Sequence, residues 1–125
     1  MSTKDIGLKG EKAAALYLKL RFYKILKRNF TTRYGELDII AKNYKYLCFV
    51  EVKTRSNNSY GSPAEYVDKH KQNRLIKTAY SYLKRNPTKL MPRFDIAEVY
   101  HHNGKFKINY IKNAFMVTEE NYHNH

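Results

Sequence analysis

Two carboxylates and a lysine stand in two neighbouring apolar stretches of the sequence: Asp38 in the first, and Glu51 and Lys53 in the second. Paired carboxylates bind hard divalent cations such as Mg²⁺, which complete their coordination with water and substrate phosphate oxygens. A lysine beside them would steady a phosphate or activate the attacking water. These residue types therefore indicate metal-assisted chemistry on a phosphodiester.

The two stretches are predicted to be adjacent antiparallel strands joined by a short turn. Side chains alternate between the faces of a strand, so Glu36 and Asp38 share one face, and so do Glu51 and Lys53. The apolar residues take the other face: Leu37, Ile39 and Ala41, and then Cys48, Val50 and Val52. Matching the apolar faces places Asp38 opposite Glu51 and Glu36 opposite Lys53. Opposed like charges destabilise a sheet by up to about 1 kcal/mol, which favours a cation between Asp38 and Glu51.

A third carboxylate, Glu11, falls in the middle of an apolar helical stripe. At 100° per residue, that stripe contains Leu8, Ala14, Ala15, Leu18 and Phe22. A carboxylate directed at a core is costly unless something there requires it. Ordinary surface ion pairs are the alternative explanation for the strand charges, and Glu11 makes that explanation the weaker one.

The rest of the chain supplies the elements that must position these residues. We expect helices at 3–22 and 64–85, an extended segment at 23–29, and strands at 36–42, 46–54, 93–100 and 105–111. The last two strands flank Asn103-Gly104, a strong hairpin turn signal. The order α-β-β-β-α-β-β predicts an α/β fold in which two helices flank a mixed sheet. Residues 1–118 would form one domain and residues 119–125 a disordered tail.

The charge balance indicates a polyanionic partner. The 125 residues include 24 Lys and Arg against 11 Asp and Glu, a formal net charge of +13. Nucleic acid fits this field best, and Tyr44, Tyr46 and Tyr60 are the tyrosines best placed to stack on bases. The single cysteine, Cys48, reads as a core residue. It excludes an intramolecular disulfide, and no apolar run approaches the roughly 18 residues of a membrane span, so we expect a cytoplasmic protein.

The ordered pattern resembles known nucleases. Asp38 followed by Glu51-Val52-Lys53 is similar to the D…ExK signature of the PD-(D/E)xK superfamily, and Glu11 matches the extra acidic residue of its Holliday-junction resolvase branch. More closely, the chain resembles the bacterial YraN family over roughly residues 7 to 115. Its landmarks here include Gly10-Glu11, Arg28-Asn29, Gly35-Glu36-Leu37-Asp38, Phe49-Val50-Glu51-Val52-Lys53, Arg55, Lys71, Arg74-Leu75 and Arg93-Phe94-Asp95.

The resemblance implies a restriction-endonuclease-like core that uses Mg²⁺ or Mn²⁺. Asp38, Glu51 and the Val52 carbonyl would be the metal ligands, Lys53 would be catalytic, and Glu11 would complete the acidic cluster. Because resolvase relatives act as dimers, the resemblance also implies a homodimer.

Four cations are predicted to contact phosphates: Arg28, Arg55, Lys71 and Arg74. Lys71 is equally well explained by a stem packed on an apolar face, and Arg28 and Arg55 by simple solvation. We expect an endonuclease that hydrolyses DNA, rather than RNA, at branched or damaged structures. The alternatives are a non-catalytic nucleic-acid-binding module that retains the nuclease fold, and an RNA-associated assembly factor.

Overall fold

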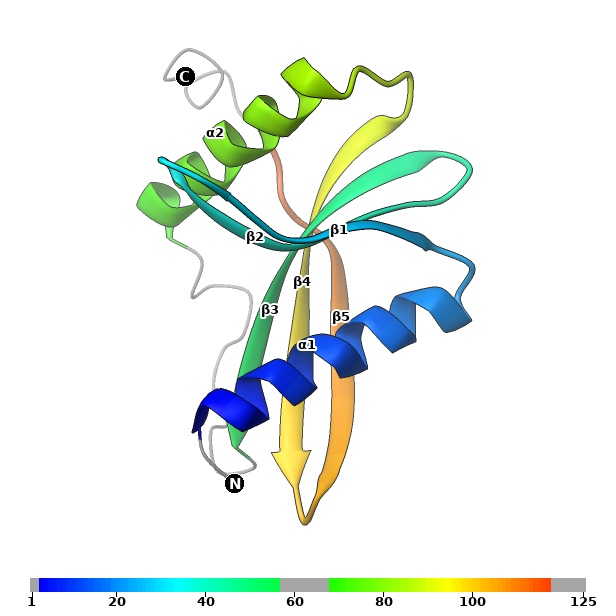
Figure 1. The fold of residues 1–125 in the computed structure, drawn as a ribbon, viewed down its shortest axis with the longest axis vertical. Helices are drawn as coiled ribbons and strands as arrows, with labels where there is room; N and C mark the ends of the chain where they lie inside the picture. Colours follow the sequence, from blue (N-terminus) through cyan, green and yellow to red (C-terminus); the bar gives the residue numbers. More distant parts are fainter. Residues whose placement is uncertain (1–2, 57–67, 118–125) are drawn as a thin grey trace.

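The computed structural model describes residues 3–56 and 68–117, and the predicted order of elements is confirmed (Figure 1). The elements are α1 (Thr3–Leu20), β1 (Lys24–Thr32), β2 (Gly35–Lys42), β3 (Tyr46–Ser56), α2 (Lys69–Arg85), β4 (Met91–His102) and β5 (Lys105–Phe115). Tyr60, the predicted helical positions 64–67 and the predicted tail 119–125 lie outside the described residues. Neither helix in the described part of the chain has the length and apolar character needed to cross a membrane.

The strands form one mixed sheet, as predicted, and their order in it is β1-β2-β3-β4-β5. β3 and β4 are parallel, and the other neighbours are antiparallel. A parallel pair needs a long crossover connection, and α2 lies in that connection. β3 is therefore the central strand, and it carries Glu51 and Lys53 into the middle of the sheet.

Each face of the sheet packs against one helix through its own apolar cluster. The cluster under α2 contains Ile40, Phe49, Leu75, Ile76 and Phe94, and the cluster under α1 contains Ala14, Leu18, Ile39, Val50 and Ala97, among others. Alternation along β3 explains the division, because Phe49 faces α2 while Cys48 and Val50 face α1. The same alternation directs Glu51 and Lys53 toward the α2 side. Cys48 is buried as predicted, and burial raises the pKa of its thiol to about 12.

The prediction that Leu37 shares a face with Ile39 and Ala41 is wrong. Leu37 packs in the α2 cluster, whereas the other two residues pack in the α1 cluster. Opposite Asp38 in the β1–β2 ladder lies Asn29, whose φ is +54°. A left-handed residue rotates the chain locally, and asparagine tolerates this conformation better than most residues. The far end of the β1–β2 hairpin is thereby turned toward α2, and Asp38 lies at the change of face.

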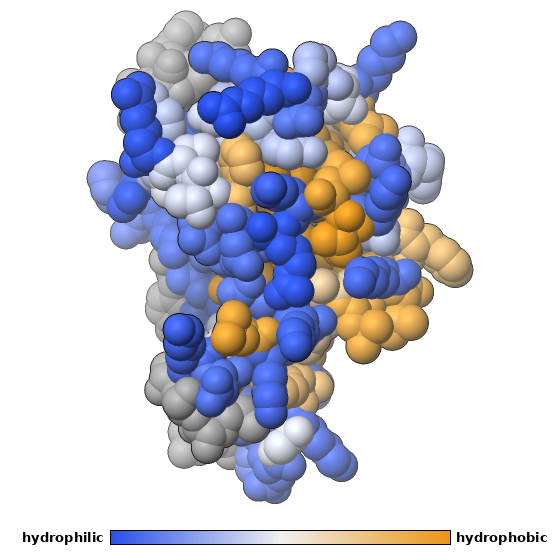
Figure 2. Space-filling model, in the orientation of Figure 1, coloured by the Kyte–Doolittle hydropathy of each residue, from blue (hydrophilic) through white to orange (hydrophobic). Residues whose placement is uncertain are grey.

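Helix α1 is shorter than predicted at its C-terminal end. It ends at Leu20, and Phe22 follows with φ +70° and 92% exposure, so Phe22 is not part of the buried stripe. Leu8 is also exposed, whereas Ala14, Ala15 and Leu18 are buried as predicted. Figure 2 shows apolar side chains gathered near this end of α1. Near the middle of α1, a Cβ added to Gly10 would collide with the Thr54 side chain, so the helix closely approaches β3 beside Glu11.

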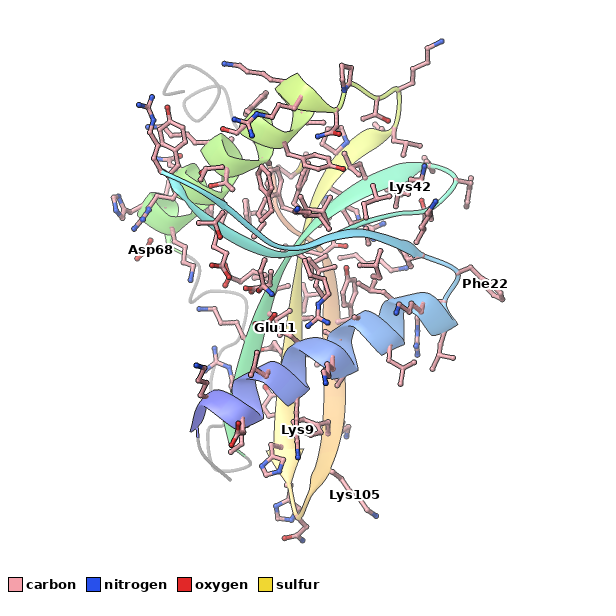
Figure 3. The ribbon with its side chains drawn as sticks, viewed as in Figure 1. Lys9, Glu11, Phe22, Lys42, Asp68 and Lys105 are labelled. Carbon is pink, nitrogen blue, oxygen red and sulfur yellow. The ribbon has the colours of Figure 1, made fainter. Side chains whose placement is uncertain are left out.

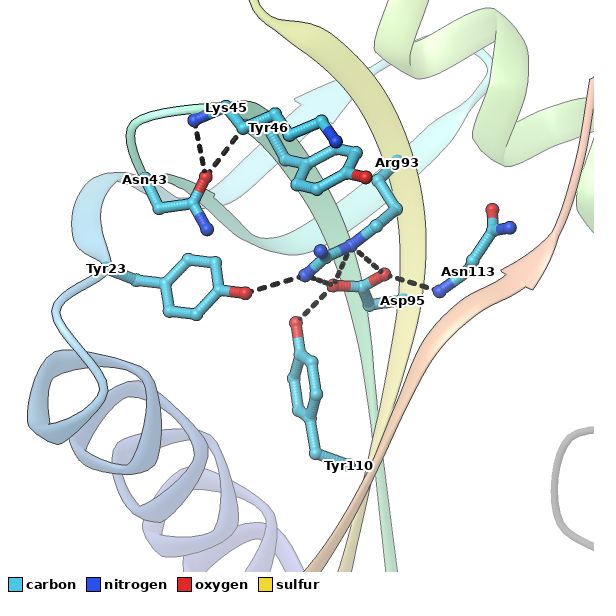
Figure 4. Close-up of polar contacts among 8 residues, drawn as sticks. All are labelled: Tyr23, Asn43, Lys45, Tyr46, Arg93, Asp95, Tyr110 and Asn113. Atoms are coloured by element: carbon cyan, nitrogen blue, oxygen red, sulfur yellow. Dashed lines mark hydrogen bonds and ion pairs between the residues drawn. The ribbon is translucent and has the colours of Figure 1, made fainter.

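A buried polar network joins the segment before β1 to β4 and β5 (Figure 4). The ion pair Arg93–Asp95 has an Nη2–Oδ2 distance of 2.9 Å. Arg93 donates to the Tyr23 hydroxyl at 2.8 Å. Asp95 accepts from the Tyr110 hydroxyl at 2.6 Å and from the backbone amide of Asn113 at 2.8 Å. Because both buried charges are paired and hydrogen-bonded, removal of one partner would leave an uncompensated charge. This network accounts for the Arg93-Phe94-Asp95 landmark as a structural feature.

Candidate active site

A cleft of about 460 Å³ opens between β2, β3 and the first turns of α2. One wall holds Glu36, Asp38 and Glu51, and the facing wall holds Lys71 and Arg74. Gly35, Asp68, His70 and Leu75 complete the lining. Asp68 caps α2 by accepting from the Lys71 amide at 2.8 Å, which fixes the first turn at the rim (Figure 3). The cleft therefore has an acidic wall and a basic wall that face each other.

Asp38 lies where the β2–β3 ladder ends. The ladder runs from Lys42–Leu47 to Ile39–Val50, which is the predicted register. The next pair in that register is Asp38 and Glu51, but the strands separate there, and the Val52 amide donates to Asp38 Oδ2 at 2.7 Å. Among these described strands, the ladder does not extend to Glu36 and Lys53. The carboxylates of Asp38 and Glu51 thus face the cleft beyond the last sheet pair.

The surroundings of Asp38 oppose its negative charge. Burial is the main cause that raises the pKa of its carboxyl to about 7, and the charges of Glu51, Glu11 and Glu36 raise it further. The hydrogen bond from the Val52 amide acts in the opposite direction. At neutral pH this carboxylate gains from a proton or a nearby cation, as residues at functional sites often do.

Glu11 reaches the same cluster from α1. Its Oε1 lies 3.6 Å from Arg28 Nη2. With the Asn29 amide oriented so that its nitrogen faces the carboxylates, that nitrogen donates to Glu11 Oε1 at 3.0 Å and to Glu36 Oε1 at 3.2 Å. Glu11 is therefore half-buried against polar partners of β1 rather than directed into an apolar core. Asn29 has a left-handed backbone conformation, and its side-chain amide contacts both Glu11 and Glu36.

Two lysines, Lys53 and Lys71, lie near Glu51. Lys71 Nζ lies 3.5 Å from Glu51 Oε1. Burial lowers the pKa of Lys53, and the nearby charges of Lys71 and Arg55 lower it further, while Glu51 opposes the shift. A lysine with a lowered pKa is better suited to exchange a proton near neutral pH than a solvated one. The structure thus brings Glu51, Lys53 and Lys71 together.

The oxygen atoms of this wall fit a hard divalent cation. Among residues 3–56 and 68–117, no three His, Cys, Asp or Glu side chains form a preformed metal group. Mg²⁺ requires only one or two carboxylates besides water and phosphate oxygens, and Asp38 and Glu51 line one cleft. Because the N–H and C=O of a strand residue point the same way, the Val52 carbonyl also faces the gap beside Asp38.

The four predicted phosphate contacts already have partners within the protein. Arg28 pairs with Glu11, Lys71 pairs with Glu51, and Arg74 Nε donates to the Tyr34 carbonyl at 2.8 Å. Arg55 Nε lies 3.8 Å from Glu98 Oε2. Lys71 and Arg74 line the cleft, whereas Arg28 lies beside the acidic cluster. Of the two interpretations of Lys71, a phosphate contact or a stem packed on an apolar face, neither included the ion pair with Glu51 that the structure shows.

Sequence reasoning missed Glu98 and Asp68. Glu98 on β4 pairs in register with Lys53, is fully buried, and accepts from the Asn109 amide nitrogen at 2.8 Å. Its other oxygen has no hydrogen-bond donor within the described residues. The sequence signal for Glu98 was its place in the segment 94–99, where two carboxylates, Asp95 and Glu98, interrupt apolar residues. The sequence signal for Asp68 was weaker, because it consisted only of an aspartate, a preferred N-cap residue, near the start of a helix.

Comparisons with known proteins agree on one family. Residues 10–99 match the sequence profile described as "Uncharacterised protein family UPF0102". A UPF0102 protein of Syntrophomonas wolfei is 47% identical over 114 residues, which cover 90% of this chain and 98% of that protein. A UPF0102 protein of Caldanaerobacter subterraneus is 45% identical over 119 residues, which cover 92% of this chain and 98% of that protein. A UPF0102 protein of Clostridium botulinum is 47% identical over 118 residues, which cover 91% of this chain and 96% of that protein.

Proposed function

The chain belongs to the uncharacterised protein family UPF0102, and we propose that it is a metal-dependent endonuclease that hydrolyses DNA phosphodiester bonds. Membership confirms the resemblance to the YraN family, while the further resemblance to resolvase-like nucleases supports the proposed activity. The observation that carries the proposal is the crowding of Asp38 by Glu51, Glu11 and Glu36 in a cleft whose opposite wall is basic. Such a cluster favours a cation on one side and a phosphate on the other.

Asp38 and Glu51 line the cleft, Val52, Lys53 and Glu11 lie beside these two carboxylates, and each has a definite part in this proposal. Asp38, Glu51 and the Val52 carbonyl would hold Mg²⁺ or Mn²⁺, which when bound stabilises charge on the phosphate and activates water. Lys53 Nζ would contact the reacting phosphate and exchange a proton with the attacking water. Glu11 would add its own negative charge beside Asp38, which makes a cation at this site more favourable.

The basic wall would orient the nucleic acid. Lys71 and Arg74 lie across the cleft from the carboxylates, so a phosphate between the walls would meet opposite charges on its two sides. A branched or damaged DNA would supply the accessible phosphate that a narrow cleft requires. DNA is preferred to RNA in this proposal because the resemblance is to DNA nucleases.

A cleavage panel tests the proposal. The full chain is incubated with a four-way junction, a flap, a nicked duplex and single-stranded DNA in millimolar Mn²⁺. We expect the wild type to cut at least one substrate, and Asp38→Asn, Glu51→Gln and Lys53→Met to reduce the rate by roughly 10²-fold or more. Lys105→Gln, which removes an exposed cation at the β4–β5 turn, is the matched control and should change the rate less than about twofold.

The rival function, a non-catalytic binding module, gives different results. It predicts no cleavage, and it predicts DNA binding that does not depend on Mn²⁺. Calorimetry separates the two, because the nuclease proposal requires one Mn²⁺ site that Glu51→Gln removes. Cleavage that persists in Asp38→Asn and Lys53→Met would assign the activity to a contaminant and overturn the proposal.

A further inference from the structure

A second concave surface lies at the opposite end of β2 and β3. Its volume is about 710 Å³, and its main lining residues are Lys42, Tyr44, Lys45, Thr88, Lys89 and Met91, which we call the turn patch. Figure 3 shows Lys42 at this end of the molecule, far from Asp68 at the candidate active site. At about 3.3 Å per strand residue, Tyr44 lies roughly 20 Å along the chain from Asp38. The turn patch is therefore separate from the cleft.

The charge of the turn patch has one sign. Lys42 is the last residue of β2, Lys45 lies in the β2–β3 turn, and Lys89 lies in the segment before β4. No Asp or Glu occurs among the described residues that line the patch. Three lysines around one concavity attract an anion that presents several charges, such as successive phosphates of a strand.

Tyr44 stands out from this basic surface on a rigid turn. Its side chain is 91% exposed. Asn43 Oδ1 accepts from the Lys45 amide at 2.9 Å and from the Tyr46 amide at 2.7 Å (Figure 4). The Met91 amide donates to the Lys45 carbonyl at 3.0 Å, which ties the turn to the start of β4. An aromatic ring held on a fixed backbone loses little freedom when a flat ligand stacks on it.

We propose that the turn patch binds a single-stranded nucleic-acid segment, with one base stacked on Tyr44 and the flanking phosphates contacted by Lys42, Lys45 and Lys89. Lysines alone would serve a duplex equally well, but an exposed ring stacks most readily on an unpaired base, whose face is free. An anionic lipid surface fits less well because, besides Tyr44, Met91 is the only large apolar side chain of the described lining with high exposure, at 56%. This binding requires neither a metal nor cleavage.

Fluorescence anisotropy tests the role of Tyr44. Labelled dT15 and rU15 are titrated with the full chain in EDTA, so that metal-dependent cleavage cannot contribute. Tyr44→Ala should weaken binding by about 5- to 150-fold, since one stacked base contributes about 1–3 kcal/mol. Tyr44→Phe keeps the ring and should stay within about twofold of the wild type. Phe22→Ala is the matched control, because Phe22 is equally exposed but lies outside the patch.

The lysines are tested by salt dependence. The triple change Lys42→Gln, Lys45→Gln and Lys89→Gln should reduce the slope of log affinity against log salt by about 2, at roughly 0.7 per phosphate. The control removes the same charge from β5 through Lys105→Gln, Lys107→Gln and Lys112→Gln, and it should reduce the slope less. The relative affinity for dT15 and rU15 shows which strand chemistry is preferred.

Three outcomes would overturn the inference. They are unchanged oligonucleotide binding in Tyr44→Ala, an equal loss in Phe22→Ala, and a Tyr44 effect that occurs only with phosphatidylserine vesicles. Melting temperatures of the Tyr44 variants should match the wild type because the Tyr44 side chain is almost fully exposed. Loss of cleavage with an intact Tyr44 effect would remove the proposed nuclease function and leave this binding site standing.

Discussion

Among single residues, Asp38 shows most directly how the protein trades stability for a charged site. Its carboxyl is partly buried beside Glu51, Glu11 and Glu36, and one amide hydrogen bond from Val52 compensates only in part. A neutral isostere would fold with less repulsion. Retaining a carboxylate under such conditions is typical of sites selected for binding or catalysis.

Asp38→Asn should stabilise the protein at alkaline pH. The folded-state pKa of about 7 exceeds the ordinary 3.8, so the folded state holds its proton over a range in which the unfolded state has released it. The free energy of unfolding of the wild type should therefore fall as the pH rises from about 4 to 7. At pH 8, Asp38→Asn should exceed the wild type by on the order of 2–4 kcal/mol, and at pH 3.5 the two should converge. Urea unfolding at several pH values measures this difference.

Glu36→Gln is the control for this experiment. Glu36 is exposed and is the smallest of the three charges that raise the Asp38 pKa, so the gain at pH 8 should be clearly smaller. A loss of stability for Asp38→Asn at every pH would show that the carboxylate is needed for folding. Such a result would contradict the assigned pKa.

The sequence was sufficient to predict that Asp38 and Glu51 lie close together, because their arrangement depends on local rules. Strand alternation and a short turn set the register, and the register brings the two carboxylates together. The environment of Glu98 depends on residues of other strands, Asn109 and Arg55. It also depends on the parallel pairing of β3 with β4, which no local spacing specifies. Its role became visible only with the sheet order.

At the scale of elements, the β1–β2 hairpin and α1 are the parts that local rules described incompletely. Alternation predicted one face for Leu37 and Ile39, but the hairpin end turns at Asn29 and makes contacts with α2. Thr32 Oγ1 lies 3.4 Å from Thr78 Oγ1, and Arg74 donates to the Tyr34 carbonyl. These are tertiary contacts between β1–β2 and α2, and a single-sequence pattern does not contain them.

Two glycines of α1 provide a matched test of how closely the helix approaches the sheet. Replacing glycine by alanine inside a helix normally stabilises by up to about 1 kcal/mol. Gly7→Ala should show that gain, because nothing lies within 4 Å of the added Cβ. Gly10→Ala should instead lose on the order of 1–3 kcal/mol, because the Cβ collides with Thr54. Thermal unfolding of both variants checks the difference.

The double variant Gly10→Ala with Thr54→Ala is the control for this packing. It should recover much of the loss, since it removes the side chain that the new methyl group meets. If Gly10→Ala is as stable as Gly7→Ala, then α1 does not approach β3 as closely as described. Glu11 would then lie farther from the acidic wall as well.

At the scale of the whole molecule, the net charge of +13 surrounds a local concentration of carboxylates. The negative carboxylates at the cleft lie within an electrostatic field that is positive overall. The field would draw a polyanion to the surface, and the cluster would make its final position depend on a cation. Composition predicted the first property but not the second, which requires the fold.

Binding of duplex DNA in EDTA should therefore depend steeply on salt. If about five phosphates are neutralised, the slope of log affinity against log salt is about −4 to −5, or a loss of roughly 10²–10³-fold between 50 and 200 mM salt. Filter binding or anisotropy with a 20-base-pair duplex measures the slope. A slope near −1 would mean that the surplus charge is not engaged with DNA.

The parallel pairing of β3 with β4 also sets an order of assembly. The β1–β2–β3 meander and the β4–β5 hairpin each join neighbours in sequence, but the β3–β4 ladder must wait for α2 to cross the sheet. During synthesis the carboxylates of Glu11, Asp38 and Glu51 emerge before the helix that carries Lys71 and Arg74. The nascent chain thus acquires the negative half of its cleft first, and the arrival of α2 is the folding step that supplies the counter-charge.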